Sequence, residues 1–69
     1  MTNMYRVEVH NGQVWADGIR FNKNTQVPEF CRLAKADQFG DPRDALRFRQ
    51  QAARICGGTL RVARVPVDA

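Results

Sequence analysis

Hydrophobic and polar residues alternate near the start of the chain, with the period of a β-strand that buries one face. Val7 and Val9 are separated and flanked by polar residues, and successive side chains of a strand point to opposite faces. Asn11-Gly12 follows, a dipeptide typical of a two-residue type I′ hairpin turn because both turn positions need a positive φ. The pattern therefore predicts a hairpin in which Val9 pairs with Val14.

A second dipeptide of the same kind, Asp17-Gly18, lies a few residues further on. It predicts another two-residue turn, with Ala16 opposite Ile19. Together the two turns give a three-stranded meander whose apolar residues share one face, so the register is self-consistent. In this register Trp15, the only tryptophan, points to the other face.

The segment after the meander has two interpretations. A polar connection, residues 22–26, leads into it. Phe30 and Leu33 then have helical spacing, and Pro28 suits the first turn of a helix. We expect a short helix over residues 28–38, with an extended segment as the alternative.

The strongest local signals mark a helix over residues 42–56. Asp41 is a good N-cap, because its side chain can accept from the free amide groups of the first turn. Pro42 suits the first helical position, where no amide is needed. Gly57-Gly58 follows the last apolar residue, and glycine readily takes the left-handed conformation that ends helices.

Residues 59–67 are rich in β-branched side chains and predict a final strand. Pro66 indicates an edge strand or the strand's end, because proline cannot donate a ladder hydrogen bond. Two apolar residues, Val65 and Val67, lie near this edge. A homodimer, in which the edge strand pairs with a second copy of the chain, is therefore an open alternative. We predict one α+β domain over residues 1–69, in which a small antiparallel β-sheet (the N-terminal meander plus the C-terminal strand) packs on one or two helices.

Composition changes this picture little, but it excludes several classes of protein. With 43% hydrophobic and 26% charged residues, the chain resembles a globular protein rather than a disordered one. No apolar run could span a membrane, and no signal-peptide pattern is present, so we expect a cytoplasmic protein. Cys31 and Cys56 are interpreted as core residues, with a disulfide or redox pair as the lesser alternative. A zinc site is disfavoured, since His10 is the only histidine and the cysteines are far apart.

Catalysis has little support in the sequence. It contains no nucleophile with a nearby base, no glycine-rich phosphate loop and no cluster of metal ligands. Most of the carboxylates already fit roles as caps, turn residues or ion-pair partners. We therefore expect no enzyme, no cofactor and no metal, and the candidate residues below are binding residues.

The basic residues suggest a second hypothesis, that the protein binds nucleic acid. The formal net charge is +4, and nine of the eleven basic residues are arginine. Arginine binds phosphate and carboxylate groups through two parallel hydrogen bonds, although a GC-rich coding sequence explains its abundance equally well. Along the polar side of the predicted main helix lie Arg43, Arg47, Arg54 and Gln50. This stripe could follow phosphates, but the solvated face of an amphipathic helix is the simpler interpretation.

Trp15 is the leading candidate for a partner-binding residue. The predicted register places it on the outward face, flanked by Glu8 and Arg20, and tryptophan with arginine is common at interface centres. Cross-strand packing with a cation–π contact is the structural alternative. Arg61 on the last strand is assigned to the same surface. Arg49 projects into the apolar arc of the main helix. Three interpretations are open: it forms an ion pair, it extends to solvent at the helix edge, or it lies in an interface with another chain.

Four short motifs occur in an order that is similar to that of phage inhibitors of bacterial RNA polymerase. They are Trp15-Ala16, Val27-Pro28, Asp44-Ala45-Leu46 and Val62-Ala63-Arg64-Val65-Pro66. The resemblance implies a phage-encoded host-takeover protein in which Arg64, on the final strand, contacts the polymerase. Small anti-CRISPR proteins resemble this chain in size and architecture.

The function predicted from the sequence is therefore that of a small non-enzymatic binding protein, encoded by a phage or mobile element. It would dock on a host protein or ribonucleoprotein complex in the host cytoplasm and inhibit or modulate that complex. The alternative is a small basic nucleic-acid-binding protein that uses the arginine stripe of the main helix.

Overall fold

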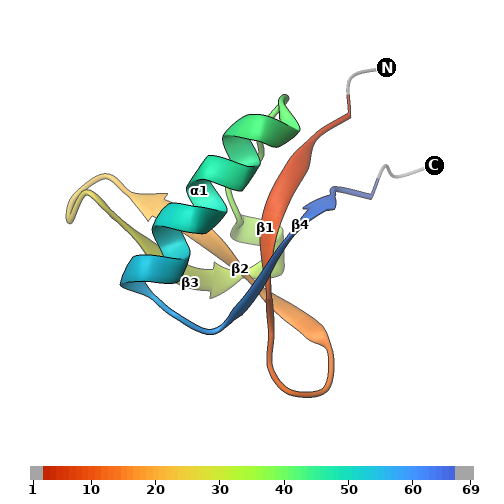
Figure 1. The fold of residues 1–69 in the computed structure, drawn as a ribbon, viewed down its shortest axis with the longest axis horizontal. Helices are drawn as coiled ribbons and strands as arrows, with labels where there is room; N and C mark the ends of the chain where they lie inside the picture. Colours follow the sequence, from red (N-terminus) through yellow and green to blue (C-terminus); the bar gives the residue numbers. More distant parts are fainter. Residues whose placement is uncertain (1–2, 67–69) are drawn as a thin grey trace.

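The computed structural model describes residues 3–66, and in it a four-stranded antiparallel sheet packs against one α-helix (Figure 1). The elements in chain order are β1 (Tyr5–His10), β2 (Trp15–Asn22), β3 (Val27–Arg32), the 3-10 turn η1 (Leu33–Lys35), α1 (Pro42–Ile55) and β4 (Thr59–Arg64). The strand order is β3-β2-β1-β4, so the last strand returns beside the first. The predicted α+β fold is confirmed. Neither α1 nor η1 is long and apolar enough to cross a membrane.

The core lies between α1 and one face of the sheet. It is formed by Val7, Val9, Ile19, Phe48, Ala52 and Leu60. The predicted inward orientation of β1 is confirmed, since Val7 is fully buried and Val9 nearly so. Each buried valine or leucine side chain contributes about 1.5–3 kcal/mol, which matters in a domain of this size.

The main helix forms as its local signals predict. The Asp41 carboxylate accepts a hydrogen bond from the backbone N–H of Arg43 at 2.8 Å. Pro42 occupies the first turn, and α1 ends at Ile55, one residue before the predicted end. Gly57 follows with a φ of 71°, the left-handed conformation that favours glycine.

The two-residue turn predicted at Asn11-Gly12 is wrong. β1 and β2 are joined by a longer loop in which the N–H of Asn11 donates to the carbonyl of Val14 at 3.0 Å. The Asn11 side chain accepts two backbone N–H groups of this loop, so it replaces part of the ladder. A register shift follows Val9, and His10 pairs with Trp15.

The second predicted turn, at Asp17-Gly18, is also wrong, because both residues lie inside β2. Gly18 is needed there for packing, since a Cβ on it would lie 2.5 Å from the Cβ of Ala36. The chain turns instead at the polar connection that follows. There Gln26 has a φ of 60°, and its N–H donates to the carbonyl of Asn22 at 2.7 Å.

The helix predicted over residues 28–38 is wrong, and the extended alternative is correct for its first half. β3 pairs with β2 along its whole length, with Phe30 opposite Ile19. Pro28 is tolerated because β3 is an edge strand. Only Leu33–Lys35 forms a short helical turn. Hairpin pairing with β2 outweighs the local helical spacing.

The segment after η1 fills a split between β1 and β2. The N–H of Asp37 donates to the carbonyl of Ile19 on β2 at 3.2 Å. Phe39 and Tyr5 of β1 exchange two backbone hydrogen bonds, of 2.7 and 2.8 Å. The Phe39 ring then packs on Phe48 of α1, with the ring centroids 5.3 Å apart. This segment thus ties both strands to the helix.

The final strand is an edge strand, as predicted, and pairs with β1 over Thr59–Arg64. Val62 lies opposite Val7, and Leu60 lies opposite Val9. Pro66 follows the strand's end, whereas Val67 lies outside the described residues.

Candidate binding surfaces

Trp15 lies on the sheet face away from α1 and is partly buried. The guanidinium of Arg61 stacks on its ring at 4.2 Å from the centroid. The His10 ring meets it edge-on, with centroids 4.9 Å apart. The cross-strand cation–π packing that the sequence offered as an alternative is therefore present. These contacts fix the orientation of the tryptophan.

A buried carboxylate holds this arrangement in place. Glu8 is only 4% exposed and lies opposite Arg61 in the β1–β4 ladder. One of its oxygens accepts from Arg61 at 2.8 and 3.0 Å, and the other accepts from Nε of Arg6 at 2.9 Å. A buried charge is tolerated when it is paired in this way. We call Arg6, Glu8, His10, Trp15 and Arg61 the Trp15 cluster.

The sequence-based interpretation placed Glu8 beside Trp15 on the outward face, but it missed Arg6 as a member of this cluster. Arg6 and Glu8 are two residues apart on β1, which places both on one face, and this spacing is visible in the sequence. The partnership with Arg61 is not, because it depends on the β1–β4 pairing.

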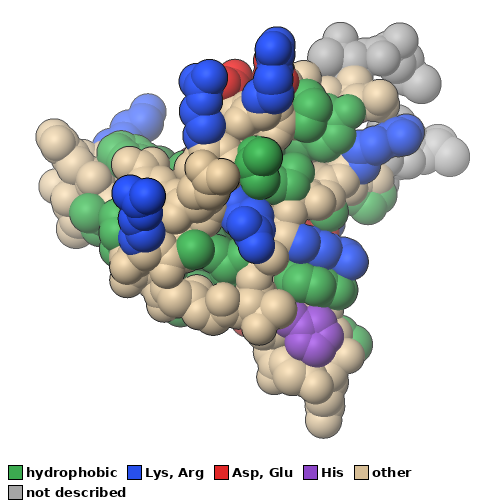
Figure 2. All heavy atoms as spheres, viewed as in Figure 1, with side chains coloured by type: hydrophobic (Ala, Val, Ile, Leu, Met, Phe, Trp, Pro, Cys, Tyr) green, Lys and Arg blue, Asp and Glu red, His purple; other side chains and the backbone are tan. Residues whose placement is uncertain are grey.

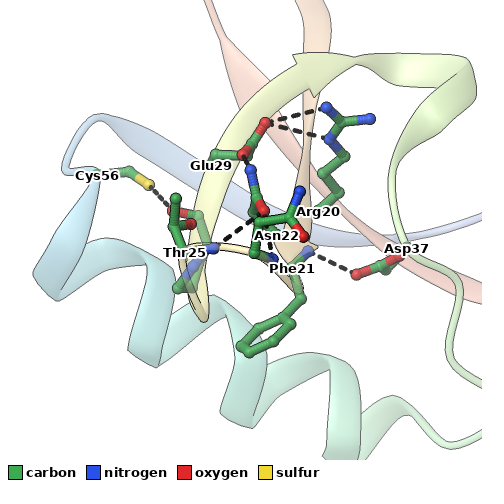
Figure 3. A network of polar contacts seen from close by, with 9 residues as sticks. Arg20, Phe21, Asn22, Thr25, Glu29, Asp37 and Cys56 are labelled. Atoms are coloured by element: carbon green, nitrogen blue, oxygen red, sulfur yellow. Dashed lines mark hydrogen bonds and ion pairs between the residues drawn. The ribbon is translucent and has the colours of Figure 1, made fainter.

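Arg20 lies apart from Trp15, on the β2–β3 side of the same face (Figure 3). Its guanidinium donates to Glu29 at 3.1 and 3.2 Å, and the Asn22 amide donates to the other oxygen of Glu29. The Asn22 hydrogen bond, followed by the Arg20 contacts, holds the pKa of Glu29 below its usual range. Arg20 is therefore occupied in a cross-strand ion pair and does not flank the tryptophan as predicted.

Arg64 also lies apart from the Trp15 cluster. It is three residues beyond Arg61 on β4, so its side chain is on the α1 side of the sheet. Of the four predicted partner-binding residues, the structure brings together Trp15 and Arg61, while Arg20 and Arg64 occupy two other surfaces.

The predicted arginine stripe is exposed along α1, where basic side chains are spread over the surface of the molecule (Figure 2). The Arg43 side chain is 84% exposed and is bound to Asp41 at 2.9 Å. This contact lowers the pKa of Asp41 and raises that of Arg43. Arg47 lies 3.8 Å from Asp44. Gln50 and Arg54 are exposed as well.

Arg49 contacts the backbone of β4 and has no carboxylate partner within residues 3–66. Its Nε donates to the backbone carbonyl of Leu60 at 3.1 Å. This carbonyl lies on the outer edge of β4. Tyr5, opposite Arg64, bonds Phe39 and not β4, so by the alternation of an antiparallel ladder Val62 and Leu60 also direct their backbone groups away from β1. Arg49 thus covers part of an edge strand, a contact that hydrophobic periodicity does not reveal.

Charge is distributed unequally between the two sides of the sheet. Away from α1, the guanidinium groups of Arg6, Arg20 and Arg61 all contact glutamate. On the α1 side four arginines have no carboxylate partner within residues 3–66: Arg32, Arg49, Arg54 and Arg64. The second side therefore carries positive charge that is available to an anion.

A hollow of about 520 Å³ opens at the end of the sheet near the turn that follows α1. It is lined by Val9, His10, Asn11, Asp17, Phe30, Cys31, Arg32 and Gly58. Phe30, predicted to lie in a helix, is instead 51% exposed at this hollow. These residues come from three strands and two connections, so no single sequence motif predicts the site.

The described residues contain no cluster of metal ligands, and their two cysteines are not joined in a disulfide. No group of three histidine, cysteine or acidic residues within residues 3–66 could hold a metal ion. Cys31 and Cys56 are free thiols, and burial raises the pKa of both. Thiols with a raised pKa are poor nucleophiles at neutral pH. Cys56 instead donates to the carbonyl of Pro28 at 3.3 Å, which joins the helix end to β3.

Comparisons with protein-family models, with curated proteins and with solved structures gave no match to this chain. The similarity to phage inhibitors of RNA polymerase thus rests on the four motifs alone. The role that it implies for Arg64 stays a prediction.

Proposed function

We propose that this chain is a non-enzymatic binding protein that docks on a bacterial protein complex through the Trp15 cluster. In this proposal it is encoded by a phage or mobile element, acts in the host cytoplasm, and inhibits or modulates the complex. The observation that supports it is the fixed orientation of Trp15, whose ring is held by Arg61 and His10 at 4.2 and 4.9 Å.

Rigid tryptophan and arginine side chains are favourable at an interface. Tryptophan and arginine carry much of the binding energy in protein complexes. A side chain that is already ordered loses little conformational entropy on binding. Glu8 orders Arg61 before any partner arrives, yet the Arg61 side chain stays 47% exposed and can contact a partner.

The test is capture from bacterial lysate on immobilised protein after nuclease treatment, comparing Trp15→Ala with Arg20→Ala. Arg20 is the matched control, because it lies on the same face in an ion pair outside the Trp15 cluster. We expect Trp15→Ala to lose a nuclease-resistant protein partner, by at least about thirtyfold in affinity if Trp15 is a hot spot, and Arg20→Ala to retain it. Equal capture by both variants, with both folded, would contradict this surface assignment.

A second candidate function, nucleic-acid binding, is favoured by the unpartnered arginines of the α1 side. Arg54 on α1 has no carboxylate partner in the described part of the chain, and Arg43 and Arg47 are exposed beside it. Basic side chains that neutralise phosphates release counterions, so affinity should fall steeply with salt. Binding that is indifferent to salt would exclude this candidate.

A further inference from the structure

The hollow beside Phe30 offers an aromatic surface on an otherwise basic side of the protein. Phe30 belongs to the edge strand β3 and lies opposite the buried Ile19. The far end of its ring lies near Gly58, since a Cβ placed there would lie 3.9 Å from the Phe30 Cζ. The residue is 51% exposed and lines the hollow. An exposed aromatic ring of this kind can stack on a nucleobase, since every base has a π face.

Two charged groups without partners line the same hollow. Asp17 and Arg32 lie directly opposite each other on β2 and β3, and both are exposed. Neither has a side-chain hydrogen bond or an ion pair with another residue in the range 3–66. The other described carboxylates all have a hydrogen-bonded partner or an ion pair. An acceptor and a donor are thus both free at one site.

This pairing of groups matches the edge of a nucleobase, which carries donors and acceptors side by side. The Asp17 carboxylate would accept from a base amino or imino N–H, and the Arg32 guanidinium would donate to a ring nitrogen or carbonyl. The volume, about 520 Å³, is within the range of small-ligand sites. A paired base inside a duplex does not expose both its face and its edge, so the ligand must be single-stranded.

The surrounding charge selects a polyanion over a basic peptide. Besides Arg32, the α1 side carries Arg49 and Arg54 without carboxylate partners in residues 3–66. Arg64 lies at the opposite end of β4, paired with Tyr5. A basic segment of a protein would be repelled by this surface, whereas the phosphates that flank a base would be attracted.

We infer that the hollow binds one unpaired base of a single-stranded nucleic acid, which stacks on Phe30 between Asp17 and Arg32. The inference rests on the nucleic-acid candidate and not on the docking surface at Trp15. The two sites adjoin at His10, which lines the hollow and contacts Trp15, but each has its own variants. Failure of one therefore leaves the other testable.

The experiment is fluorescence anisotropy with short labelled single strands of RNA and DNA, and with the matching duplexes, over a range of salt. Phe30→Ala should weaken single-strand binding about tenfold or more, since one stacking contact is lost, while Phe30→Tyr should keep it. Phe21→Ala is the matched control. Phe21 is the other half-exposed phenylalanine on the α1 side, 40% exposed, and does not line the hollow. The Phe21→Ala variant should bind single strands as tightly as the wild type.

Three results would overturn the inference: no single-strand binding at low salt, duplexes bound as tightly as single strands, or equal losses for Phe30→Ala and Phe21→Ala. Thermal melting of each variant checks the fold. If Phe30→Ala is not folded at the assay temperature, Arg32→Gln decides, because it leaves the ring in place. Weaker binding by Arg32→Gln supports the site, and unchanged binding refutes it.

Discussion

The two sides of the sheet use arginine in different ways. Away from α1, Arg6 and Arg61 converge on Glu8, and Arg20 contacts Glu29. On the α1 side, Arg32 and the other unpartnered arginines have no such carboxylate within residues 3–66.

The difference has a structural reason and a functional consequence. Strand pairing brings Glu8 opposite Arg61 and Glu29 opposite Arg20, while Arg6 reaches Glu8 from two residues away on the same strand. These ion pairs order the surface, and Arg61 holds the tryptophan ring. On the second side Arg32, Arg54 and Arg64 have no carboxylate partner within residues 3–66, so their donors are free for an anion. One side is therefore suited to rigid docking on a protein, and the other to a flexible polyanion.

The largest effect on this comparison should come from Glu8→Gln. It leaves Arg61 and the mostly buried Arg6 without their shared carboxylate, and breaking a buried pair is expected to lower the free energy of unfolding by about 3 kcal/mol. Urea denaturation measures this loss. Glu29→Gln, which breaks a more exposed pair, is the control and should cost much less. Equal losses would show that burial does not distinguish the two pairs.

The next largest effect concerns the packing of the segment around Ala36 on the sheet face away from α1. Gly18→Ala places a Cβ 2.5 Å from the Cβ of Ala36, so β2 and the segment after η1 must separate. We expect a loss of about 1–3 kcal/mol, read from the same denaturation experiment. Gly40→Ala is the control, because a Cβ there meets no atom within 4 Å. A Gly18→Ala variant as stable as the wild type would mean that Ala36 packs only loosely against Gly18.

A smaller effect should separate the arginines of the two sides in nucleic-acid binding. Arg54→Gln should reduce the slope of log affinity against log salt by about 0.7–0.9, the value for one phosphate contact. Arg20→Gln, whose guanidinium is already held by Glu29, should leave the slope unchanged. A salt titration of single-strand binding measures both. A lower slope for Arg20→Gln alone would reverse the assignment of the two sides.

The smallest effect is a dependence of stability on pH. The Asn22 hydrogen bond and Arg20 lower the pKa of Glu29 in the folded state. Glu29 therefore stabilises the fold above its unfolded pKa, about 4.3, and this contribution is lost as pH falls through the lowered folded pKa. In melting experiments below about pH 4.3, the wild type should lose more Tm than Glu29→Gln. Curves of Tm against pH that run parallel for the wild type and Glu29→Gln would contradict this contribution of Glu29.

The candidate surfaces were predictable only in part. Trp15 and Arg61 were singled out as members of one surface, and the structure brings them into contact. The partner predicted for Trp15, Arg20, lies elsewhere because the real register of β2 differs from that of two tight turns. The hollow at Phe30 was missed, since that residue was expected in a helix.

By itself the sequence determined the elements whose signals are local. The cap at Asp41, the proline at Pro42 and the glycine at Gly57 define α1, because capping and backbone conformation depend on neighbouring residues. Alternation around Val7 likewise defines β1. These elements, with the final strand, were enough to give the fold class.

Only the tertiary structure decided how these elements join. Gly18 is a turn signal in isolation, but it serves in the folded chain as the site where Ala36 packs. β3 is a strand because β2 offers it a hydrogen-bonding partner, an interaction that outweighs local helical spacing. The hollow and the Trp15 cluster depend on the same pairings, since their residues are distant in sequence and meet only when the sheet assembles.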